Sequence, residues 1–249
     1  MIEVKNVSKS FEGNRVLKDV SVILEAGKTN MIIGQSGSGK TVLMKSIIGL
    51  HRVDQGRIEY DGRDMPDKEI RTLRKEVGML FQGAALFDSL SVFENVIYPL
   101  EMFASMTKKE REERTKFCLQ RVNLPERSYH LAPSEISGGM QKRVAIARAI
   151  VMNPLYLFCD EPNSGLDPQT SLIIDQLIHE ITQEYNITTI VNTHDMNSIM
   201  EIGDHIMFLE KGEKRWEGTA EEIFHADCEE LNNFVFASKL YRKIKEVNQ

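Results

Sequence analysis

Residues 34–41 read Gly34-Gln35-Ser36-Gly37-Ser38-Gly39-Lys40-Thr41 and fit the pattern G-x-x-x-x-G-K-[ST]. In this pattern successive backbone amides wrap phosphate groups, so small residues are needed where the chain approaches the ligand closely. An apolar strand is predicted before the loop, over residues 29–33, and a helix after it, over residues 41–49. The helix adds the positive end of its dipole to the cradle. The stretch therefore predicts a nucleoside triphosphate site, in which Lys40 contacts the β- and γ-phosphates and the Thr41 hydroxyl binds Mg²⁺.

Composition limits the kind of protein that surrounds this loop. The chain has 249 residues and is 41% hydrophobic, enough for one large α/β domain or two small ones. Its net charge of -6 disfavours a nucleic-acid partner, because binding a phosphate backbone is expected to need a basic face. Its 3 cysteines show no C-x-x-C spacing and suit a reducing cytosol. No apolar run reaches the roughly 18 residues that span a bilayer, so we expect other subunits to cross any membrane.

Periodicity predicts three kinds of structure along the chain. Residues 1–27 alternate polar and apolar, which indicates half-buried antiparallel strands, and residues 57–62 predict another strand that ends in a turn. Residues 84–150 are predicted to be helical, with a capping box that runs from Thr107 to Glu110. Apolar strands at residues 155–159 and 187–191 flank a predicted helix at 169–184. Strand, helix and strand at this spacing indicate a parallel sheet and an α/β fold.

Polar residues with possible chemical roles follow the two later strands. Asp160 and Glu161 end the strand at 155–159, where carboxylates are costly unless they serve a cation. In the phosphate-binding template the first acid binds Mg²⁺, directly or through water, and the second polarises the attacking water. His194 follows the strand at 187–191. A lone histidine is usually a structural loop residue, but ligands bind at the carboxyl ends of parallel strands, which favours a γ-phosphate contact.

These motifs together resemble those of ABC transporter ATPase subunits over nearly the whole chain. Residues 34–41 resemble the Walker A motif of that family. The other resemblances are Phe81-Gln82 to the Q-loop, Ile136-Ser137-Gly138-Gly139-Met140 to the signature motif, Asp160-Glu161 to Walker B with the catalytic glutamate, Ser164-Gly165-Leu166-Asp167 to the D-loop and His194 to the switch histidine. Two positions depart from the family pattern, because Met140 replaces the usual Gln and Asn163 replaces the common Thr.

The resemblance implies roles for individual residues. Glu161, His194 and Gln82 are expected to be catalytic, and Thr41, Gln82 and Asp160 are expected to ligate Mg²⁺. Phe11 occupies the place of the aromatic that stacks on adenine, although hairpin packing is the alternative for this residue. The residues expected to bind ATP are Phe11, Gly34, Ser36, Gly37, Ser38, Gly39, Lys40, Thr41, Ser137, Gly138 and Gly139.

The resemblance also implies an architecture. The expected fold is a P-loop NTPase core on a parallel sheet, with an antiparallel β-subdomain and a helical subdomain. The ATPase domain is expected over residues 1–225, with its helical subdomain at about 84–150, and a C-terminal helical extension over 226–249. In that extension apolar side chains recur at helical spacing, and basic ones decorate the rest. Such a helix usually docks on its own domain, but contact with the second copy, a regulatory subunit or the anionic inner leaflet is the alternative.

In this family the signature motif completes the ATP site of a second copy. The resemblance therefore implies a head-to-tail homodimer around a two-fold axis. Ser137 and Gly139 of one copy would contact the γ-phosphate that Lys40 of the other copy holds. ATP then closes the dimer, and hydrolysis opens it, which makes the dimer a two-state element biased by its ligand.

Two stretches indicate which transporter the subunit serves. Residues 83–90 and 133–140, including Met140, closely resemble the ATPases of MCE-type (Mla) phospholipid transporters. This resemblance implies a peripheral subunit on the cytoplasmic side of a bacterial inner membrane. Its expected partners are permease subunits, an MCE-domain protein and a small cytosolic regulatory subunit. Apolar side chains between Leu86 and Val96 would receive a permease helix, or would pack in an ordinary helical core.

Other members of the same family are the alternatives. The chain would then power a solute importer, a lipoprotein-releasing system or a cell-wall-remodelling complex. A non-transport ABC protein acting on DNA or ribosomes is disfavoured, because such proteins usually carry fused nucleotide domains or insertions.

Overall fold

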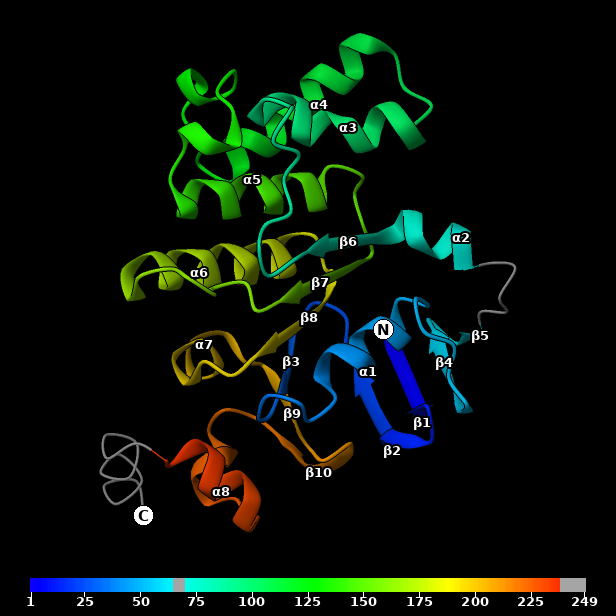
Figure 1. Ribbon diagram of the computed structural model, residues 1–249. Coiled ribbons are helices and arrows are strands. Elements are labelled where there is room, and N and C mark those ends of the chain that lie inside the picture. The colour runs from blue at the N-terminus through cyan, green and yellow to red at the C-terminus, as the bar shows by residue number, and fades with distance from the viewer. Residues whose placement is uncertain (65–69, 238–249) are drawn as a thin grey trace. The chain divides into compact units, whose positions relative to one another are not determined.

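The computed structural model describes residues 1–64 and 70–237 (Figure 1). Contacts between residues divide the chain into two compact units. The first unit contains residues 1–70 together with the chain from residue 188 onward, and the second contains residues 71–187. Each unit is described by itself below.

The first unit begins with an antiparallel sheet. Strand β1 (Ile2–Phe11) pairs with β2 (Asn14–Leu24) on one side and with β4 (Gln55–Tyr60) on the other, and β5 (Arg63–Asp64) pairs with β4. Alternating side chains such as Val4 and Val22 are buried, which confirms the half-buried strands predicted for residues 1–27. The sheet is the β-subdomain that the sequence predicted.

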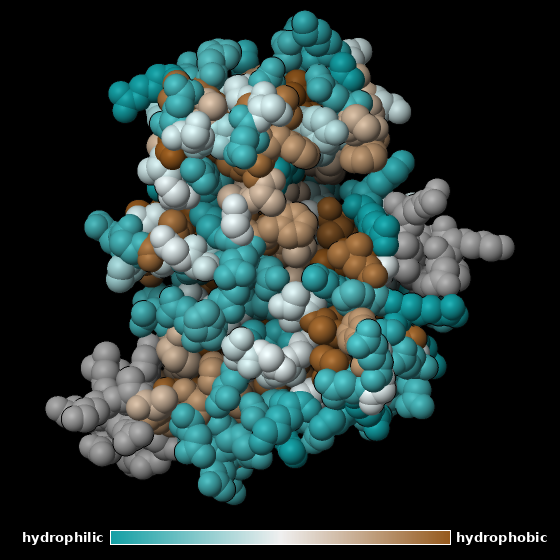
Figure 2. Space-filling view, in the orientation of Figure 1, coloured by the Kyte–Doolittle hydropathy of each residue, from teal (hydrophilic) through white to brown (hydrophobic). Residues whose placement is uncertain are grey.

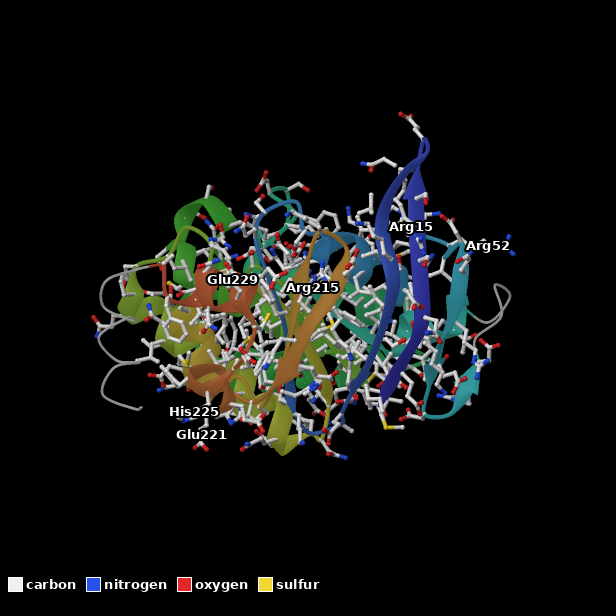
Figure 3. The ribbon with its side chains drawn as sticks, turned by 90° about the horizontal axis from the view of Figure 1, so that it is seen from below. Arg15, Arg52, Arg215, Glu221, His225 and Glu229 are labelled. Atoms are coloured by element: carbon white, nitrogen blue, oxygen red, sulfur yellow. The ribbon has the colours of Figure 1, made fainter. Side chains whose placement is uncertain are left out.

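The first unit also holds a mostly parallel set of strands. Strand β3 (Thr29–Ile33) lies between β8 (Thr188–Thr193) and β9 (His205–Glu210), parallel to both, and β10 (Glu213–Gly218) pairs antiparallel with β9. The three middle strands are buried almost throughout, as strands covered on both faces should be. Strand β10 contacts β2, and Figure 3 shows the two strands side by side with Arg15 and Arg215 labelled on them.

Helices complete the first unit. Helix α1 (Lys40–Ile47) follows β3, and α7 (Met196–Ile202) follows β8. The chain then continues after β10 through the 3₁₀ turn η4 (Glu222–His225) to α8 (Glu229–Val235). The ring of Phe234 packs on Phe208 of β9 at 5.5 Å between centroids, and Leu231 is fully buried. The described part of the C-terminal helix therefore docks on its own unit. The basic positions beyond it, with Tyr241 and Ile244, lie outside the described residues.

The second unit is built on two parallel strands. Helix α2 (Ile70–Leu73) and the turn η1 (Arg74–Glu76) lead into β6 (Val77–Leu80), which pairs with β7 (Tyr156–Asp160). Helix α6 (Pro168–Glu184) follows β7 and packs against α5. The predicted strand at 155–159 is therefore shifted by one residue. Leu155 lies outside the strand and is 50% exposed, so the apolar run starts one position before the buried segment.

Three helices form the middle of the second unit: α3 (Val92–Phe103), α4 (Lys108–Arg121) and α5 (Gly138–Ile150), which contact one another. Two short 3₁₀ turns, η2 (Glu126–Ser128) and η3 (Pro133–Glu135), connect α4 to α5. The capping box predicted at Thr107 and Glu110 is present, and Ser91 and Glu94 form a second one at the start of α3. Between residues 70 and 237 and before residue 65, no helix is long and apolar enough to cross a membrane.

Candidate functional site

The loop at residues 34–41 has the shape of a phosphate cradle. Gly34 is buried with φ +149, and a Cβ atom there would lie 2.2 Å from the carbonyl oxygen of Leu209. No other residue would fit in that space without moving the backbone of β9. The ammonium of Lys40 folds onto the loop and donates to the carbonyl oxygens of Gly34 at 2.7 Å and Gln35 at 3.1 Å. The side chain is 8% exposed, so its charge lies inside the loop.

The donors of the cradle suit a phosphate. The Ser38 hydroxyl is buried and has no hydrogen-bond partner among the described residues. Gly39 is the N-cap of α1 and offers no side chain to its first turn. An anion there would satisfy the hydroxyl and the first amides of the helix at once. Ser36, Gly37 and Thr41 are exposed, which leaves the loop open to a ligand. The residues present therefore fit a bound triphosphate.

Pairing of β3 and β8 places His194 beside the cradle. Ile33 is the register partner of Thr193, so Gly34 and His194 each follow one member of the same pair. Asp195 caps α7 by accepting from the amide of Asn197 at 2.9 Å, and its own amide donates to the Thr193 hydroxyl. These bonds fix the backbone on the far side of His194, whose side chain is exposed. The structure thus brings together two of the predicted site elements at the carboxyl edge of the parallel strands.

Phe11 ends β1 and is 39% exposed. Its ring and the His51 ring form a T-shaped pair with centroids 5.2 Å apart, and Lys9 Nζ lies 5.3 Å from the Phe11 ring centroid. Asp54 holds this strand end, because it accepts from Lys9 Nζ at 2.8 Å and from the amide of Ser10 at 2.6 Å. Phe11 is therefore a supported, accessible aromatic rather than a core residue, which suits the predicted stacking role.

In the second unit, the parallel pair β6 and β7 aligns the predicted catalytic residues. Leu80 is the register partner of Cys159, so Gln82 and Glu161 follow the pair by two positions each. The side-chain amide of Gln82 donates to the Ser164 hydroxyl at 3.2 Å. Asp160 is half-buried at the end of β7. Its carboxylate oxygens and the side-chain amide oxygen of Gln82 are ligands of the kind that Mg²⁺ prefers.

Glu161 has an unusual backbone conformation. Its φ is 48, in the left-handed region that residues with a Cβ atom rarely adopt. The conformation turns the chain sharply after β7, and the amide of Ser164 closes the turn on the Glu161 carbonyl at 3.1 Å. Strained backbone of this kind clusters at functional sites, which fits the role predicted for this glutamate.

The signature segment opens helix α5. Ser137 is the N-cap, and its hydroxyl oxygen accepts from the amide of Met140 at 3.3 Å, so its hydrogen stays available for a further acceptor. A Cβ atom at Gly139 would lie 2.6 Å from the Thr170 methyl group on α6. A side chain at this position would displace Thr170, so glycine allows the close packing of α5 on α6. A Cβ atom at Gly138 would lie 3.7 Å from a methyl group of Leu166, which is ordinary contact.

A pocket of about 360 Å³ lies in front of this helix start. Its walls come from the signature residues and from the segment after β7. They are Ser137, Gly138, Gly139, Met140, Arg143, Gly165, Leu166, Asp167, Thr170 and Ile173. Asp167 caps α6, and hydrogen bonds from the Thr170 hydroxyl and amide hold the pKa of its carboxyl below its usual value. The signature and D-loop segments of one chain thus share one surface.

Several supporting residues were not singled out from the sequence. Lys142 donates from its ammonium to the Gln82 carbonyl oxygen, and Arg148 donates to the carbonyls of Ala84 and Ala85. A signal existed, since both are charged residues in a helix that also carries a run of apolar residues, Val144–Ala147. The departure at Asn163 also has a structural partner, because its buried amide donates to Asp175 of α6 at 2.8 Å.

Comparison with known protein families supports the sequence resemblance. The family model described as "ABC transporter" matches residues 17–164. The methionine import ATP-binding protein MetN of Clostridium acetobutylicum is 39% identical over 94% of this chain and 74% of that protein. The "Probable ribonucleotide transport ATP-binding protein mkl" of Mycobacterium leprae is 38% identical over 84% of this chain and 60% of that protein.

A solved structure agrees with the fold. The ATP-binding cassette MJ0796, in a dimeric post-hydrolysis state bound to ADP and Pi, matches with a TM-score of 0.79 and 33% identity. The match covers 88% of this chain and 99% of that one. The predicted fold, an α/β P-loop core with an antiparallel β-subdomain and a helical part, is therefore confirmed.

Proposed function

This chain belongs to the ABC transporter family, and we propose that it is the ATP-hydrolysing subunit of a bacterial membrane transporter. The ATPase activity follows from the family, whose cassettes bind and hydrolyse ATP. The observation that carries the proposal is the cradle at residues 34–41, where a buried lysine and the unpartnered Ser38 hydroxyl converge on an uncapped helix start.

The residues have distinct roles in the proposed reaction. Lys40 and the amides of the loop bind the β- and γ-phosphates, and Phe11 stacks on the adenine. Glu161 orients and polarises the attacking water, Gln82 contributes to its placement, and His194 contacts the γ-phosphate. Thr41, Asp160 and Gln82 would hold Mg²⁺, which neutralises charge on the phosphate oxygens when bound.

We propose that two copies assemble head to tail. The pocket of about 360 Å³ in front of Ser137 and Gly139 offers a hydroxyl and the positive end of α5 to an anion. In the family that this chain resembles, the signature motif contacts the nucleotide held by the second copy. The phosphate facing the Ser137 hydroxyl and the start of α5 would therefore come from that second copy. The dimeric structure of MJ0796, to which this chain is similar, supports this arrangement.

A permease partner is proposed for an apolar groove in the second unit. The groove measures about 610 Å³ and is lined by residues of η1, β6, α3, α5 and the loop after β6. Phe87 and Phe103 are 45% and 58% exposed there, and Arg148 and Arg74 add charge at its wall. Figure 2 shows apolar side chains, in tan and brown, between the helices α3 and α4 and the strand β6. An exposed apolar groove of this size suits an inserted helix. We place the subunit at the cytoplasmic side of the inner membrane, held by that partner.

The cargo is a separate question from the chemistry. Relatives that import methionine support a solute importer better than a lipid transporter. However, relatives of 39% and 38% identity are named for different cargoes, methionine and ribonucleotide, so identity in this subunit does not fix the cargo. We therefore propose solute import first. Phospholipid transport with an MCE-domain protein is the second candidate, and residues 83–90 and Met140 favour it.

Purification from native membranes tests the proposal. The tagged chain is isolated with its partners in mild detergent, and the partners are identified by mass spectrometry. A permease together with a solute-binding protein would support import, and a permease together with an MCE-domain protein would support lipid transport. Recovery without any polytopic membrane protein would overturn the transporter role while leaving the ATPase activity to be measured separately.

A further inference from the structure

Two cations on helix α5 hold the loop that carries Gln82. The ammonium of Lys142 donates to the Gln82 carbonyl oxygen. The guanidinium of Arg148 donates to the carbonyl oxygens of Ala84 and Ala85, each at 2.8 Å. All of these residues belong to the second unit, and both cations lie on α5 (Figure 1), whose N-cap is Ser137.

The loop needs such support because its backbone is strained. Ala84 and Ala85 have φ values of 61 and 49, both in the left-handed region. Two consecutive alanines rarely adopt this conformation, because their Cβ atoms crowd the following carbonyl. The bidentate donation from Arg148 stabilises the orientation of both carbonyls. Gln82 therefore sits at the start of a loop whose shape depends on α5.

Lys142 is unusual because its ammonium group is buried. Its side chain is only 5% exposed, although a buried ammonium is costly unless it is paired. Burial lowers the pKa of Lys142, whereas the negative charge of Glu161 acts in the opposite direction. The cation thus binds the Gln82 backbone and interacts with the charge of Glu161, the two groups that the proposed hydrolysis uses beside the attacking water.

Arg148 connects the same loop to the apolar groove. Its guanidinium carbon lies 5.9 Å from the centroid of the Phe87 ring. Arg148, Phe87 and Ala85 all line the groove. A partner that displaces Phe87 or contacts Arg148 would therefore act on the carbonyls that this guanidinium holds.

We propose that Lys142 is a positioning residue for ATP hydrolysis, which sets Gln82 through its backbone carbonyl, with Arg148 as the second anchor of the same loop. The inference rests on the proposed function, since it assumes that Gln82 and Glu161 act on ATP. Neither cation touches the nucleotide in this scheme. Their effect passes through Gln82, and this distinguishes them from residues that only stabilise the fold.

The first test compares Lys142→Met with Lys142→Arg and with Lys116→Met, an exposed lysine on α4 as control. Lys142→Met should lower the kcat of ATP hydrolysis about tenfold, the scale of one lost charged hydrogen bond, with the KM for ATP within about twofold. Lys142→Arg keeps a donor and should recover most of kcat. Equal kcat in Lys142→Met and Lys116→Met would overturn the inference.

The second test separates positioning from folding. Lys142→Met and Arg148→Met are each combined with Gln82→Ala, which removes the side-chain amide but keeps the backbone carbonyl. If the cations act through Gln82, each should lower kcat much less in the Gln82→Ala background than in the wild type. Full additivity, or a loss of kcat that simply follows the melting temperature, would show a structural role only.

The proposed function has its own control in the same experiment. If Glu161→Gln hydrolyses ATP as fast as the wild type, the catalytic assignment itself is wrong. If Glu161→Gln is inactive and Lys142→Met is not impaired, only the positioning inference fails.

Discussion

Glu161 combines a proposed chemical role with a strained backbone. A residue with φ 48 costs of order 1–3 kcal/mol relative to a relaxed one, and the turn closed by Ser164 maintains it. Substitution by glutamine keeps the size and the backbone requirement but removes the base. The Glu161→Gln variant therefore tests the role of the carboxylate alone.

Glu161→Gln should retain ATP binding and lose turnover by about 100-fold or more, as is typical when a general base is removed. The release of phosphate under saturating Mg²⁺–ATP measures the turnover, and fluorescence of a labelled nucleotide measures the binding. Turnover within a few-fold of the wild type would contradict the assignment of Glu161 as the base.

Lys40→Ala tests the cradle rather than the base. The ammonium already bonds the loop carbonyls of Gly34 and Gln35, so its removal takes away both a phosphate ligand and a support of the loop. We expect the Kd for ATP to rise at least tenfold, because charged hydrogen bonds contribute about 1.5–3 kcal/mol. Calorimetric titration at fixed Mg²⁺ measures it. Lys45→Ala, an exposed lysine on the same helix, is the matched control and should leave the Kd unchanged.

At the scale of single elements, helix α4 illustrates a local signal that the structure bears out. The Thr107 hydroxyl accepts from the Glu110 amide at 3.3 Å, and Glu110 accepts from the Thr107 amide at 2.7 Å. The hydrogen bonds from Thr107 also hold the pKa of the Glu110 carboxyl below its usual value. The cap is therefore formed with an ionised glutamate.

Thr107→Ala should lower the free energy of unfolding by about 1 kcal/mol, the usual contribution of an N-cap. Because the folded pKa of Glu110 is lowered, its stabilisation is present above the ordinary glutamate pKa of about 4.3 and is lost as the pH falls through the folded value. The difference between wild type and variant should therefore shrink on acidification. Urea unfolding at pH 7 and pH 3 measures it, with Lys116→Ala as control. A difference that is independent of pH would show that Glu110 is not part of the cap.

Sequence patterns predicted the elements whose side chains are buried in a regular pattern along the chain. The strand over residues 29–33 has the predicted bounds, because all five side chains are buried. Strand β10 was not predicted: it is the edge strand beside β9 and reads Glu213-Lys-Arg-Trp-Glu-Gly218, with charges that edge strands use against unwanted pairing. Strand β6 was also missed, because four residues with a glycine among them carry too little periodicity.

The candidate site also has a part that local sequence predicted and a part that depends on long-range contacts. The cradle was predictable because eight consecutive residues make it, and their spacing alone specifies the chemistry. The bond from Gln82 to Ser164 and the bond from Lys142 to the Gln82 carbonyl join residues 82 and 60 positions apart. Such contacts depend on the pairing of β6 with β7 and on the packing of α5 against β6, which no local pattern encodes.

For the whole molecule, the two-copy assembly makes its own prediction. Glu161→Gln with Mg²⁺–ATP should accumulate as a dimer, because the γ-phosphate that closes the interface is not removed. The wild type should return to monomer as ATP is consumed. Light scattering coupled to size exclusion distinguishes the two. Ser137→Arg, which fills the pocket in front of α5, should abolish the dimer while leaving binding of ATP to the monomer intact. A monomer at every nucleotide concentration would remove the support for a paired site.

The first turn of α1 lacks the side-chain N-cap that the first turns of the longer helices have. Helices α3, α4, α5 and α6 each begin with a serine, threonine or aspartate that accepts from an amide of the first turn, but α1 begins after Gly39. In the proposed site, a phosphate group of ATP is the missing acceptor, so bound nucleotide would complete the first turn of α1. Amide hydrogen exchange in the first turn of α1 should accordingly slow when ATP binds, while exchange at the start of α4 stays the same. If exchange slows as expected, the concentration of ATP would set the local order of α1 as well as the rate of hydrolysis.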